Sequence, residues 1–200
     1  MKIVLASASP RRRELLREMG LESFEICRSS HEEAPAPGLT PRDTVAYIAE
    51  GKAREVLRNY GPDDIIIAAD TLVYLDGAPL GKPKDKADAA RMLSMLSGRE
   101  HQVLTGLAVS RGEKLLKYAE STDVRFRPLT QDEIHWYVNS GEPMDKAGAY
   151  GIQGLGRLLI EGINGDYFNV VGLPVCRLCL MLRELGVELC ASPADKGDLN

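Results

Sequence analysis

IIIAADTLVYL, residues 65–75, is the stretch that decides the fold class of this chain. Its first five residues are continuously apolar, which is typical of a strand buried on both faces of a sheet. Residues 72–75 extend the strand, and the Asp76-Gly77 pair behind them predicts a turn. A sheet that contains such a strand must be covered on both sides, so helices are expected before and after it.

Strands and helices do alternate on both sides of this stretch. Ser9-Pro10 and Thr40-Pro41 each place a capping side chain before a proline, which is the usual start of a helix. Because hairpins join some of the strands, the sheet cannot be wholly parallel, and we expect an α/β fold with a mixed sheet. The expected elements are strands over 3–6, 102–110 and 115–125, a hairpin of 158–163 with 167–171 about Asn164-Gly165, helices over about 10–19, 41–61, 85–98, 174–186 and after Thr130, and a glycine-rich loop over 141–156.

The composition is that of an ordinary globular protein, with 44% hydrophobic and 27% charged residues. A formal net charge of −4 argues against a general nucleic-acid binder, which needs a surplus of lysine and arginine. No apolar run approaches the ~20 residues of a membrane span, and the opening MKIVL is too short for a signal peptide. We therefore expect a cytoplasmic protein with no nucleic-acid or membrane partner. It is expected to be a single domain over 1–189 with a polar tail over 190–200.

The cysteines and histidines give no sign of a metal cage. Cys176 and Cys179 form a C-x-x-C pair, but no second ligand pair follows, and the surrounding run is apolar at helical spacing. We therefore predict two buried helix cysteines, because free cysteine behaves as a small hydrophobic residue. His31, His101 and His135 lack metal-ligand spacing and are predicted to be surface or core residues.

The segment SASPRRR, residues 7–13, is the first candidate site. It lies between a buried strand and a helix N-terminus, where free backbone N–H groups and the helix dipole attract an anion. Three arginines at this position oppose the helix dipole, so they slightly destabilise the helix and are not explained by folding stability. Arginine binds phosphate oxygens in a bidentate way. The segment therefore favours an anion site over a capped helix with a solvated basic turn.

Three further segments can carry chemistry. Asp70 is expected at the carboxyl end of its strand, where ligands of open α/β sheets gather and a carboxylate can bind a metal or accept a proton. Lys82, between a glycine and a proline, is a plausible phosphate contact, and Lys52 is a weaker one. The loop 142–154 offers an aromatic ring for stacking and the Gln153 amide for reading a base edge. Taken alone, Asp70 could equally be a turn aspartate, the lysines are better explained as solvated surface residues, and the loop could be a simple connection.

Seven motifs occur in order along the chain: LASASPRR (5–12), ADT (69–71), GKP (81–83), LSGREH (96–101), TG (105–106), DKAGAYGIQG (145–154) and NVVGLP (169–174). Together they resemble the Maf family of nucleoside triphosphate pyrophosphatases. The similarity extends over nearly the whole chain, from about Lys2 to Gly186. A single motif would be weak, whereas seven in the same order are highly specific.

The resemblance implies an elongated mixed sheet with flanking helices and two lobes around a central cleft, as in Maf and Ham1 proteins. It also implies a homodimer and a metal-dependent attack of water on the α-phosphate, which releases pyrophosphate. Asp70 matches the proton acceptor, and its carboxylate together with phosphate oxygens would suit Mg²⁺ or Mn²⁺. Glu33 matches an acidic position near the metal, but residues 29–33 read SSHEE, so Glu32 could take this role. The positions that match the triphosphate-holding side chains of the cleft are Ser7, Arg11, Arg12, Lys52 and Lys82.

The resemblance extends to the base of the substrate. Thr71 matches the branch that acts on dTTP and UTP, since the branch that acts on 7-methyl-GTP usually has glutamine there. Arg11 and Gln153 also match specificity positions of the pyrimidine branch. A glutamine amide has a donor and an acceptor, which suit O4 and N3–H of uracil or thymine. We therefore expect cleavage of dTTP and UTP, with some activity on other or modified pyrimidine nucleotides.

Two other functions are compatible with parts of the sequence. A nucleotidyltransferase also has a basic loop after its first strand and a later Gly-Lys-Pro, but typically has more glycine in that loop. A non-catalytic regulator that binds nucleotide or a division partner has less need of Asp70 beside bound phosphates. The products discriminate between them, because a transferase needs an acceptor and a hydrolase needs only water.

Overall fold

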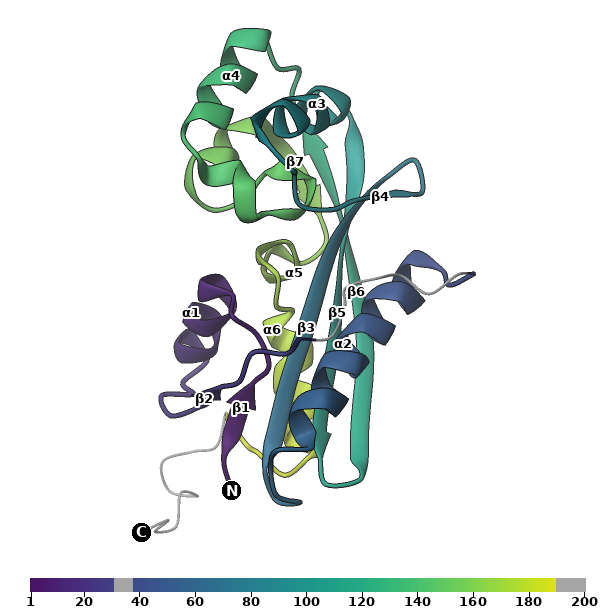
Figure 1. Cartoon of the computed structure of the whole chain (residues 1–200), viewed down its shortest axis with the longest axis vertical. Helices are drawn as coiled ribbons and strands as arrows, with labels where there is room; N and C mark the ends of the chain where they lie inside the picture. The colour runs from purple at the N-terminus through teal and green to yellow at the C-terminus, as the bar shows by residue number, and fades with distance from the viewer. Residues whose placement is uncertain (31–37, 190–200) are drawn as a thin grey trace.

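The computed structural model describes residues 1–30 and 38–189, which form one elongated mixed sheet flanked by helices (Figure 1). Its strands are β1 (Ile3–Leu5), β2 (Glu25–Ile26), β3 (Ile65–Leu75), β4 (Ala78–Leu80), β5 (Glu100–Arg111), β6 (Lys114–Phe126) and β7 (Ile160–Asn164). Within the described residues their order is β2-β1-β3-β5-β6-β7, with β4 paired to β3. The first three in this order are parallel and the remaining neighbours are antiparallel. The predicted α/β class with a mixed sheet is confirmed.

The long strands β3, β5 and β6 run along most of the molecule. β3 pairs with β1 only as far as Ile67, but it pairs with β5 from Ile65 to Tyr74. Asp70 therefore lies in the middle of β3, opposite Gly106 of β5, and the prediction that Asp70 ends its strand is wrong. The strand continues because β5 supplies hydrogen-bonding partners beyond the point where β1 stops. The strand end that lies beside Asp70 is that of β1.

Helices cover both faces of the sheet. Alternate residues of β3 face opposite ways: Ile65 and Ile67 pack in one cluster with α1 and α6, and Ile66 and Ala68 pack in another with α2. All four are fully buried, so the prediction of a strand buried on both faces is confirmed. The helices are α1 (Pro10–Glu18), α2 (Pro41–Leu57), α3 (Lys86–Leu96), α4 (Gln131–Asn139), α5 (Tyr167–Val171) and α6 (Val175–Glu184), with short 3-10 helices η1 (Glu142–Asp145), η2 (Ala147–Ala149) and η3 (Gly154–Leu159).

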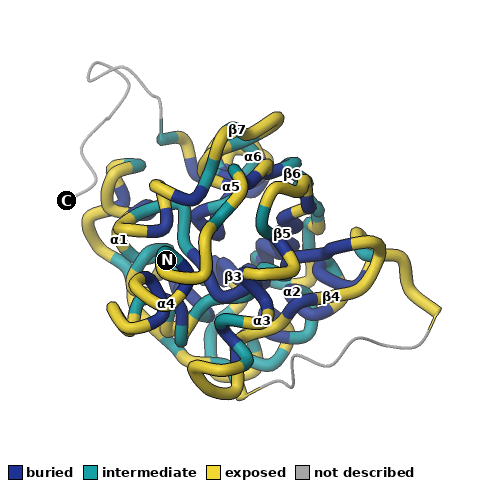
Figure 2. Tube along the Cα trace, turned by 90° about the horizontal axis from the view of Figure 1, so that it is seen from above, coloured by how far each residue is buried: buried dark blue, intermediate teal, exposed yellow. Residues whose placement is uncertain are grey.

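The core is divided between two lobes that share the long strands. One lobe contains α1, α2 and α6, and the other contains α3, α4 and the short helices, at the opposite end of the sheet in Figure 1. Seen along the long axis, the buried residues gather around β3 and β5 (Figure 2). This division confirms the two-lobed architecture and leaves the space between the lobes next to the middle of β3.

The helix α2 lies unusually close to the sheet at Gly106. A Cβ atom at this position would lie 1.9 Å from the backbone oxygen of Val45 on α2. Such a separation is impossible for a real side chain, so only glycine fits here. The close approach brings the buried face of α2, which carries Lys52, against β3 and β5.

The Asn164-Gly165 pair does not join two strands. β7 ends there, and residues 167–171 form the helix α5, so the hairpin prediction is wrong. Asp166 caps this helix with its side chain. Asn169 is fully buried and its amide donates to the backbone oxygen of Val103 on β5. Long-range hydrogen bonds of this kind take the place of the backbone pairing that a second strand would make. No local sequence pattern predicts them.

The C-x-x-C pair is only partly as predicted. Cys179 is half-buried, but Cys176 is exposed, so the prediction of two buried cysteines is wrong for Cys176. The buried face of α6 is formed instead by Leu178, Met181 and Leu182. Across residues 1–30 and 38–189, no helix combines the length and apolarity that a membrane crossing requires.

Candidate active site

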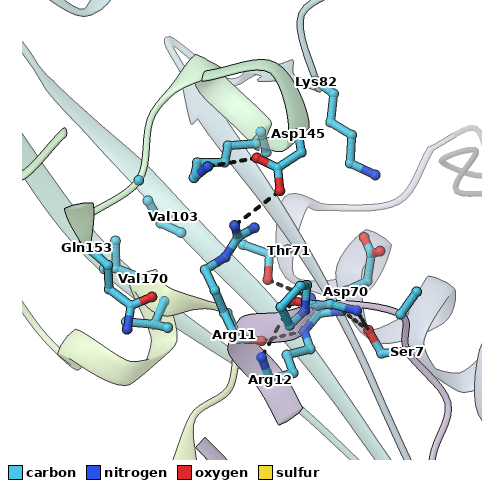
Figure 3. A pocket seen from close by; sticks show the side chains of 18 of the residues that line it. Ser7, Arg11, Arg12, Asp70, Thr71, Lys82, Val103, Asp145, Gln153 and Val170 are labelled. Carbon is cyan, nitrogen blue, oxygen red and sulfur yellow. Dashed lines mark hydrogen bonds and ion pairs between the residues drawn. The ribbon is translucent and has the colours of Figure 1, made fainter. Parts of the chain in front are cut away.

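A cavity of about 360 Å³ lies between the two lobes (Figure 3). The segment after β1, the N-terminus of α1, the middle of β3 and the loop before η3 all contribute to its wall. Glu33 and Glu32 lie outside the described residues, so their assignment stays a prediction. All the other predicted site residues line the cavity, namely Ser7, Arg11, Arg12, Lys52, Asp70, Thr71, Lys82 and Gln153.

Asp70 and Lys52 form an ion pair at the buried side of the cavity. Lys52 Nζ donates to Asp70 Oδ1 at 2.6 Å, and the residues are 7% and 4% exposed, respectively. Charged side chains are seldom buried this deeply unless they are paired. Removing a charge from water costs free energy, and a charge without a partner gains no ion-pair attraction that offsets this cost. The sequence alone gives Lys52 less support as a phosphate contact than it gives Lys82. The tight packing of α2 against the sheet brings it into contact with the carboxylate of β3.

Arg12 is held in place by oxygen atoms from three parts of the chain. Its Nε donates to Gly172 O at 2.7 Å, and its Nη1 donates to Ala69 O at 2.8 Å and to Ser7 Oγ at 3.1 Å. Its Nη2 donates to Thr71 Oγ1 at 3.0 Å. The guanidinium therefore braces the start of α1 against β3 and the loop before α6. This bracing positions the positive charge of Arg12 at the cavity wall.

Thr71 lines the cavity, but its hydroxyl proton is already used. Thr105 Oγ1 donates its proton to Asn169 O at 2.9 Å, so Thr71 must be the donor in the 2.9 Å contact between the two threonine hydroxyls. Thr71 Oγ1 also accepts from Arg12 Nη2. The hydroxyl can therefore orient Arg12 but has no proton to donate to a ligand.

Arg11 and Asp145 connect the two lobes across the cavity (Figure 3). Arg11 Nη1 donates to Asp145 Oδ2 at 3.3 Å, and Lys146 Nζ donates to Asp145 Oδ1 at 2.7 Å. Partial burial would raise the pKa of Asp145, but the two cations outweigh it and the pKa is lowered. In the sequence Asp145 is one residue of the motif DKAGAYGIQG, and we did not predict a role for it. Its place beside a lysine in a glycine-rich loop was a signal that could have marked it as a cavity residue.

Lys82 approaches the cavity from the turn after β4. The backbone N–H of Gly148 donates to Gly81 O at 3.0 Å, which ties this turn to η2. In Figure 3 Lys82 lies on the same side of the cavity as Ser7 and Asp70. That side therefore combines a lysine, the braced Arg12, a hydroxyl and the N-terminus of α1, which is the chemistry of an anion site.

The opposite side of the cavity is less polar. Val103 and Val170 lie there together with Gln153 (Figure 3). No hydrogen bond within the described part of the chain holds the Gln153 amide. Sequence reasoning missed both valines, since an apolar residue of β5 or α5 carries no signal of a cavity before the fold is known. This side can enclose a flat apolar group and offer it one amide.

Tyr150 forms a buried wall behind this side rather than an open stacking surface. It is 5% exposed, and its ring packs edge to face against Phe126 with 4.7 Å between centroids. Its hydroxyl lies 2.7 Å from His101 Nε2 in a buried hydrogen bond. Burial raises the pKa of Tyr150 and lowers the pKa of His101 to about 4. Both groups are therefore neutral near pH 7, and His101 is the core histidine that the sequence allowed.

A metal ion would have to share its ligands between protein and substrate. Within residues 1–30 and 38–189, no three potential ligand side chains cluster closely enough to hold an ion by themselves. Magnesium is commonly bound by one or two carboxylates together with substrate phosphates. Asp70 beside the anion-binding side of the cavity fits that arrangement.

Known proteins resemble this chain over nearly its whole length. The family model described as Maf-like protein matches residues 2–185. A relative from Moorella thermoacetica named dTTP/UTP pyrophosphatase is 52% identical over 191 residues, covering 94% of this chain and 97% of the relative. A second, from Symbiobacterium thermophilum and with the same name, is 51% identical over 188 residues, covering 94% and 96%. A solved nucleoside-triphosphatase, the dITP/XTP pyrophosphatase of Mycobacterium abscessus, aligns with a TM-score of 0.43 at 17% identity, covering 92% of this chain and 94% of that chain.

The family model spans the segments that build the cavity, from the anion site at the start of α1 to the loop that carries Gln153, and each of the two relatives covers 94% of this chain. The resemblance inferred from seven short motifs is thereby confirmed over almost the entire sequence. This chain belongs to the family of Maf-like proteins.

Proposed function

We propose that this chain hydrolyses dTTP and UTP to the nucleoside monophosphate and pyrophosphate. The observation that carries the proposal is the division of one cavity into a cationic side and a less polar side that ends in an amide (Figure 3). A nucleotide has the same division between its phosphates and its base. Relatives that are about half identical over nearly their full length are named for this activity.

The cationic side suits a triphosphate. Arg12, Lys82 and the N-terminus of α1 meet there, and such groups offset the charge of transferring phosphates. Because Arg12 is braced by the protein before a ligand arrives, its charge needs little reorganisation on binding. Arg11 lies between the two sides, where it can contact either the phosphates or the sugar and base.

In this mechanism Asp70 accepts a proton from the water that attacks the α-phosphorus. A bond forms between the water oxygen and phosphorus, the bond to the α–β bridging oxygen breaks, and pyrophosphate leaves with that electron pair. Lys52 Nζ holds Asp70 Oδ1 and fixes the direction of the carboxylate. A positioned general base contributes about 10²–10⁴-fold to the rate.

The proposal includes Mg²⁺ or Mn²⁺ as the cofactor. Asp70 and the phosphate oxygens would hold the ion, and either Glu33 or Glu32 could supply a further carboxylate oxygen. When bound, such an ion stabilises the charge that develops on phosphate oxygens. Among the described residues that line the cavity, the carboxylates are those of Asp70 and Asp145 and there is no cysteine or histidine, which supports this choice over a metal that prefers cysteine or histidine.

The less polar side would select the base. Gln153 would hydrogen-bond O4 and N3–H of uracil or thymine, while Val103 and Val170 would contact the ring faces and edges. A base with a mismatched edge would leave the amide unsatisfied, and such a mismatch can reduce kcat/KM by orders of magnitude. We therefore expect ATP, GTP and 7-methyl-GTP to be poorer substrates than dTTP and UTP.

The test is a panel of normal and modified triphosphates incubated with purified protein, with both products identified. Monophosphate and pyrophosphate from dTTP and UTP with water as the only acceptor support the proposal. Dependence on an added acceptor would indicate a nucleotidyltransferase, and binding without cleavage would indicate a regulator. A homodimer, a cytoplasmic location and the absence of a nucleic-acid partner stay predictions.

A further inference from the structure

The Gln153 amide has no protein hydrogen bond of its own in the described part of the chain, so its position depends on the backbone of its loop. That backbone is anchored on both sides of Gln153. Gly151 N donates to Tyr137 Oη at 3.2 Å, two residues before it. Leu155 N donates to Glu142 Oε2 at 2.8 Å, two residues after it. Both anchors come from the end of α4 and the start of η1.

Tyr137 and Glu142 act as one unit. Tyr137 Oη donates to Glu142 Oε1 at 2.9 Å, and the same carboxylate oxygen accepts from Gly156 N at 3.1 Å. Tyr137 is fully buried, and burial together with Glu142 raises its pKa, so it stays protonated and remains the donor. Burial alone would raise the pKa of Glu142, but the hydrogen bonds from Leu155, Gly156 and Tyr137 outweigh it and lower the pKa.

The loop is shaped to fit against this carboxylate. Gly154 has a φ of +66°, and a Cβ there would lie 2.5 Å from Glu142 Oε2. A Cβ on Gly156 would lie 2.3 Å from Gly151 O and 2.7 Å from Tyr137 Oη. Gly154 therefore allows the chain to approach Glu142 closely, and Gly156 allows it to approach Gly151 and Tyr137. The side chain of Glu142 fills the inside of the turn that presents Gln153 to the cavity.

We infer that Glu142, braced by Tyr137, is the positioning residue for base recognition: it fixes the loop 151–156 so that the Gln153 amide faces the base. This inference rests on the proposed function. Glu142 itself is absent from the cavity wall, so any effect on substrate choice must pass through the loop. A displacement of about 1 Å in a substrate-positioning group can cost up to about a hundredfold in rate.

Glu142→Gln is the first test variant, because it keeps the size of the side chain but replaces one carboxylate oxygen by an N–H₂ group that faces amide donors. We expect kcat/KM for dTTP to fall by at least about tenfold, with a much smaller change for GTP. The ratio of kcat/KM for dTTP to that for GTP should therefore decrease. Glu133→Gln is the matched control. Glu133 also accepts a backbone N–H bond and pairs with an arginine in the same lobe, but it does not touch the loop. It should change stability and leave the dTTP/GTP preference unaltered.

A double-mutant cycle separates positioning from general destabilisation. If Glu142 acts through Gln153, adding Glu142→Gln to Gln153→Ala should narrow the dTTP/GTP preference no further. Additive losses of preference in the double variant would overturn the inference, as would an unchanged preference in Glu142→Gln. If Glu142→Gln does not fold, Tyr137→Phe, which removes one bond to Glu142 and one to Gly151, is carried through the same cycle.

The activity of the wild-type protein on dTTP and UTP distinguishes a failure of the proposed function from a failure of the positioning role of Glu142. If it cleaves neither dTTP nor UTP, the proposed function is wrong. If it cleaves them with a clear preference and the cycle is additive, the proposed function stands and the positioning role of Glu142 is wrong. Amide hydrogen exchange at Leu155 and Gly156 provides a readout without substrate, and we expect faster exchange there in Glu142→Gln than in Glu133→Gln.

Discussion

Mild acid should lower the free energy of unfolding, because His101 takes up a proton more readily in the unfolded chain than in the folded protein. His101 is 2% exposed, and burial lowers its pKa from 6.5 to about 4. The unfolded chain therefore binds a proton near pH 6.5, whereas the folded protein resists it until about pH 4. The stability that the neutral imidazole provides is complete above the unfolded pKa and is lost as the pH falls between these two values.

The magnitude follows from the two pKa values. Each pH unit between them corresponds to about 1.4 kcal/mol, so the full loss is about 3 kcal/mol, of which about 2 kcal/mol is lost by pH 5. For a chain of this length, about 2 kcal/mol corresponds to roughly 4–8 °C in Tm. Other acid-sensitive groups, such as Glu133 with its pKa lowered to about 2, also contribute to the raw profile. The comparison must therefore be made against a variant that lacks only the imidazole.

His101→Gln is that variant, since its amide can keep a hydrogen bond with Tyr150 but does not titrate. Urea unfolding of both proteins at about pH 7.5 and about pH 5 gives the difference in free energy at each pH. We expect the wild type to lose about 2 kcal/mol more than His101→Gln over this interval. Parallel losses in the two proteins would show that His101 titrates normally and that the reasoning from its burial is wrong.

Three further outcomes are expected. Arg12→Lys keeps the charge but cannot reproduce four fixed hydrogen bonds, so it should lower both the free energy of unfolding, by at least about 1.5 kcal/mol, and kcat/KM. Arg13→Lys, outside the cavity wall, is its control, and equal effects of the two would refute the bracing role. Gly106→Ala should destabilise by about 3 kcal/mol or more in chemical denaturation, because its Cβ meets α2, while Gly162→Ala, with no atom within 4 Å, should change little. Excess EDTA should abolish dTTP cleavage and added Mg²⁺ or Mn²⁺ should restore it; undiminished activity in EDTA would exclude the proposed cofactor.

The sequence predicted the fold best where one local signal determined one element. The apolar run of β3, the proline starts of α1 and α2, and the helix that begins after Thr130 all appear where they were expected. The failures are of another kind. The Asn164-Gly165 pair has the local chemistry of a hairpin, but contacts of Asn169 with distant strands select a helix instead.

The sequence predicted which residues belong to the site but not which of their side chains contact one another. Resemblance to the family identified eight of the polar side chains that line the cavity, since motif residues can be matched without a structure, but it missed Val103 and Val170. The pairing of Lys52 with Asp70 depends on the close approach of α2 at Gly106, which only the folded chain reveals. The roles of Thr71 in holding Arg12 and of Glu142 in anchoring the loop likewise arise from contacts between residues far apart in sequence or from loop geometry.

The most direct test of the central claim is hydrolysis of dTTP in heavy-oxygen water, with mass analysis of both products. Attack of water on the α-phosphorus, assisted by Asp70, places the heavy oxygen in dTMP and leaves pyrophosphate unlabelled. Asp70→Asn should still bind dTTP but should form labelled dTMP at least about a hundredfold more slowly. Heavy oxygen in pyrophosphate or in inorganic phosphate, or labelled dTMP formed by Asp70→Asn at the wild-type rate, would contradict the account.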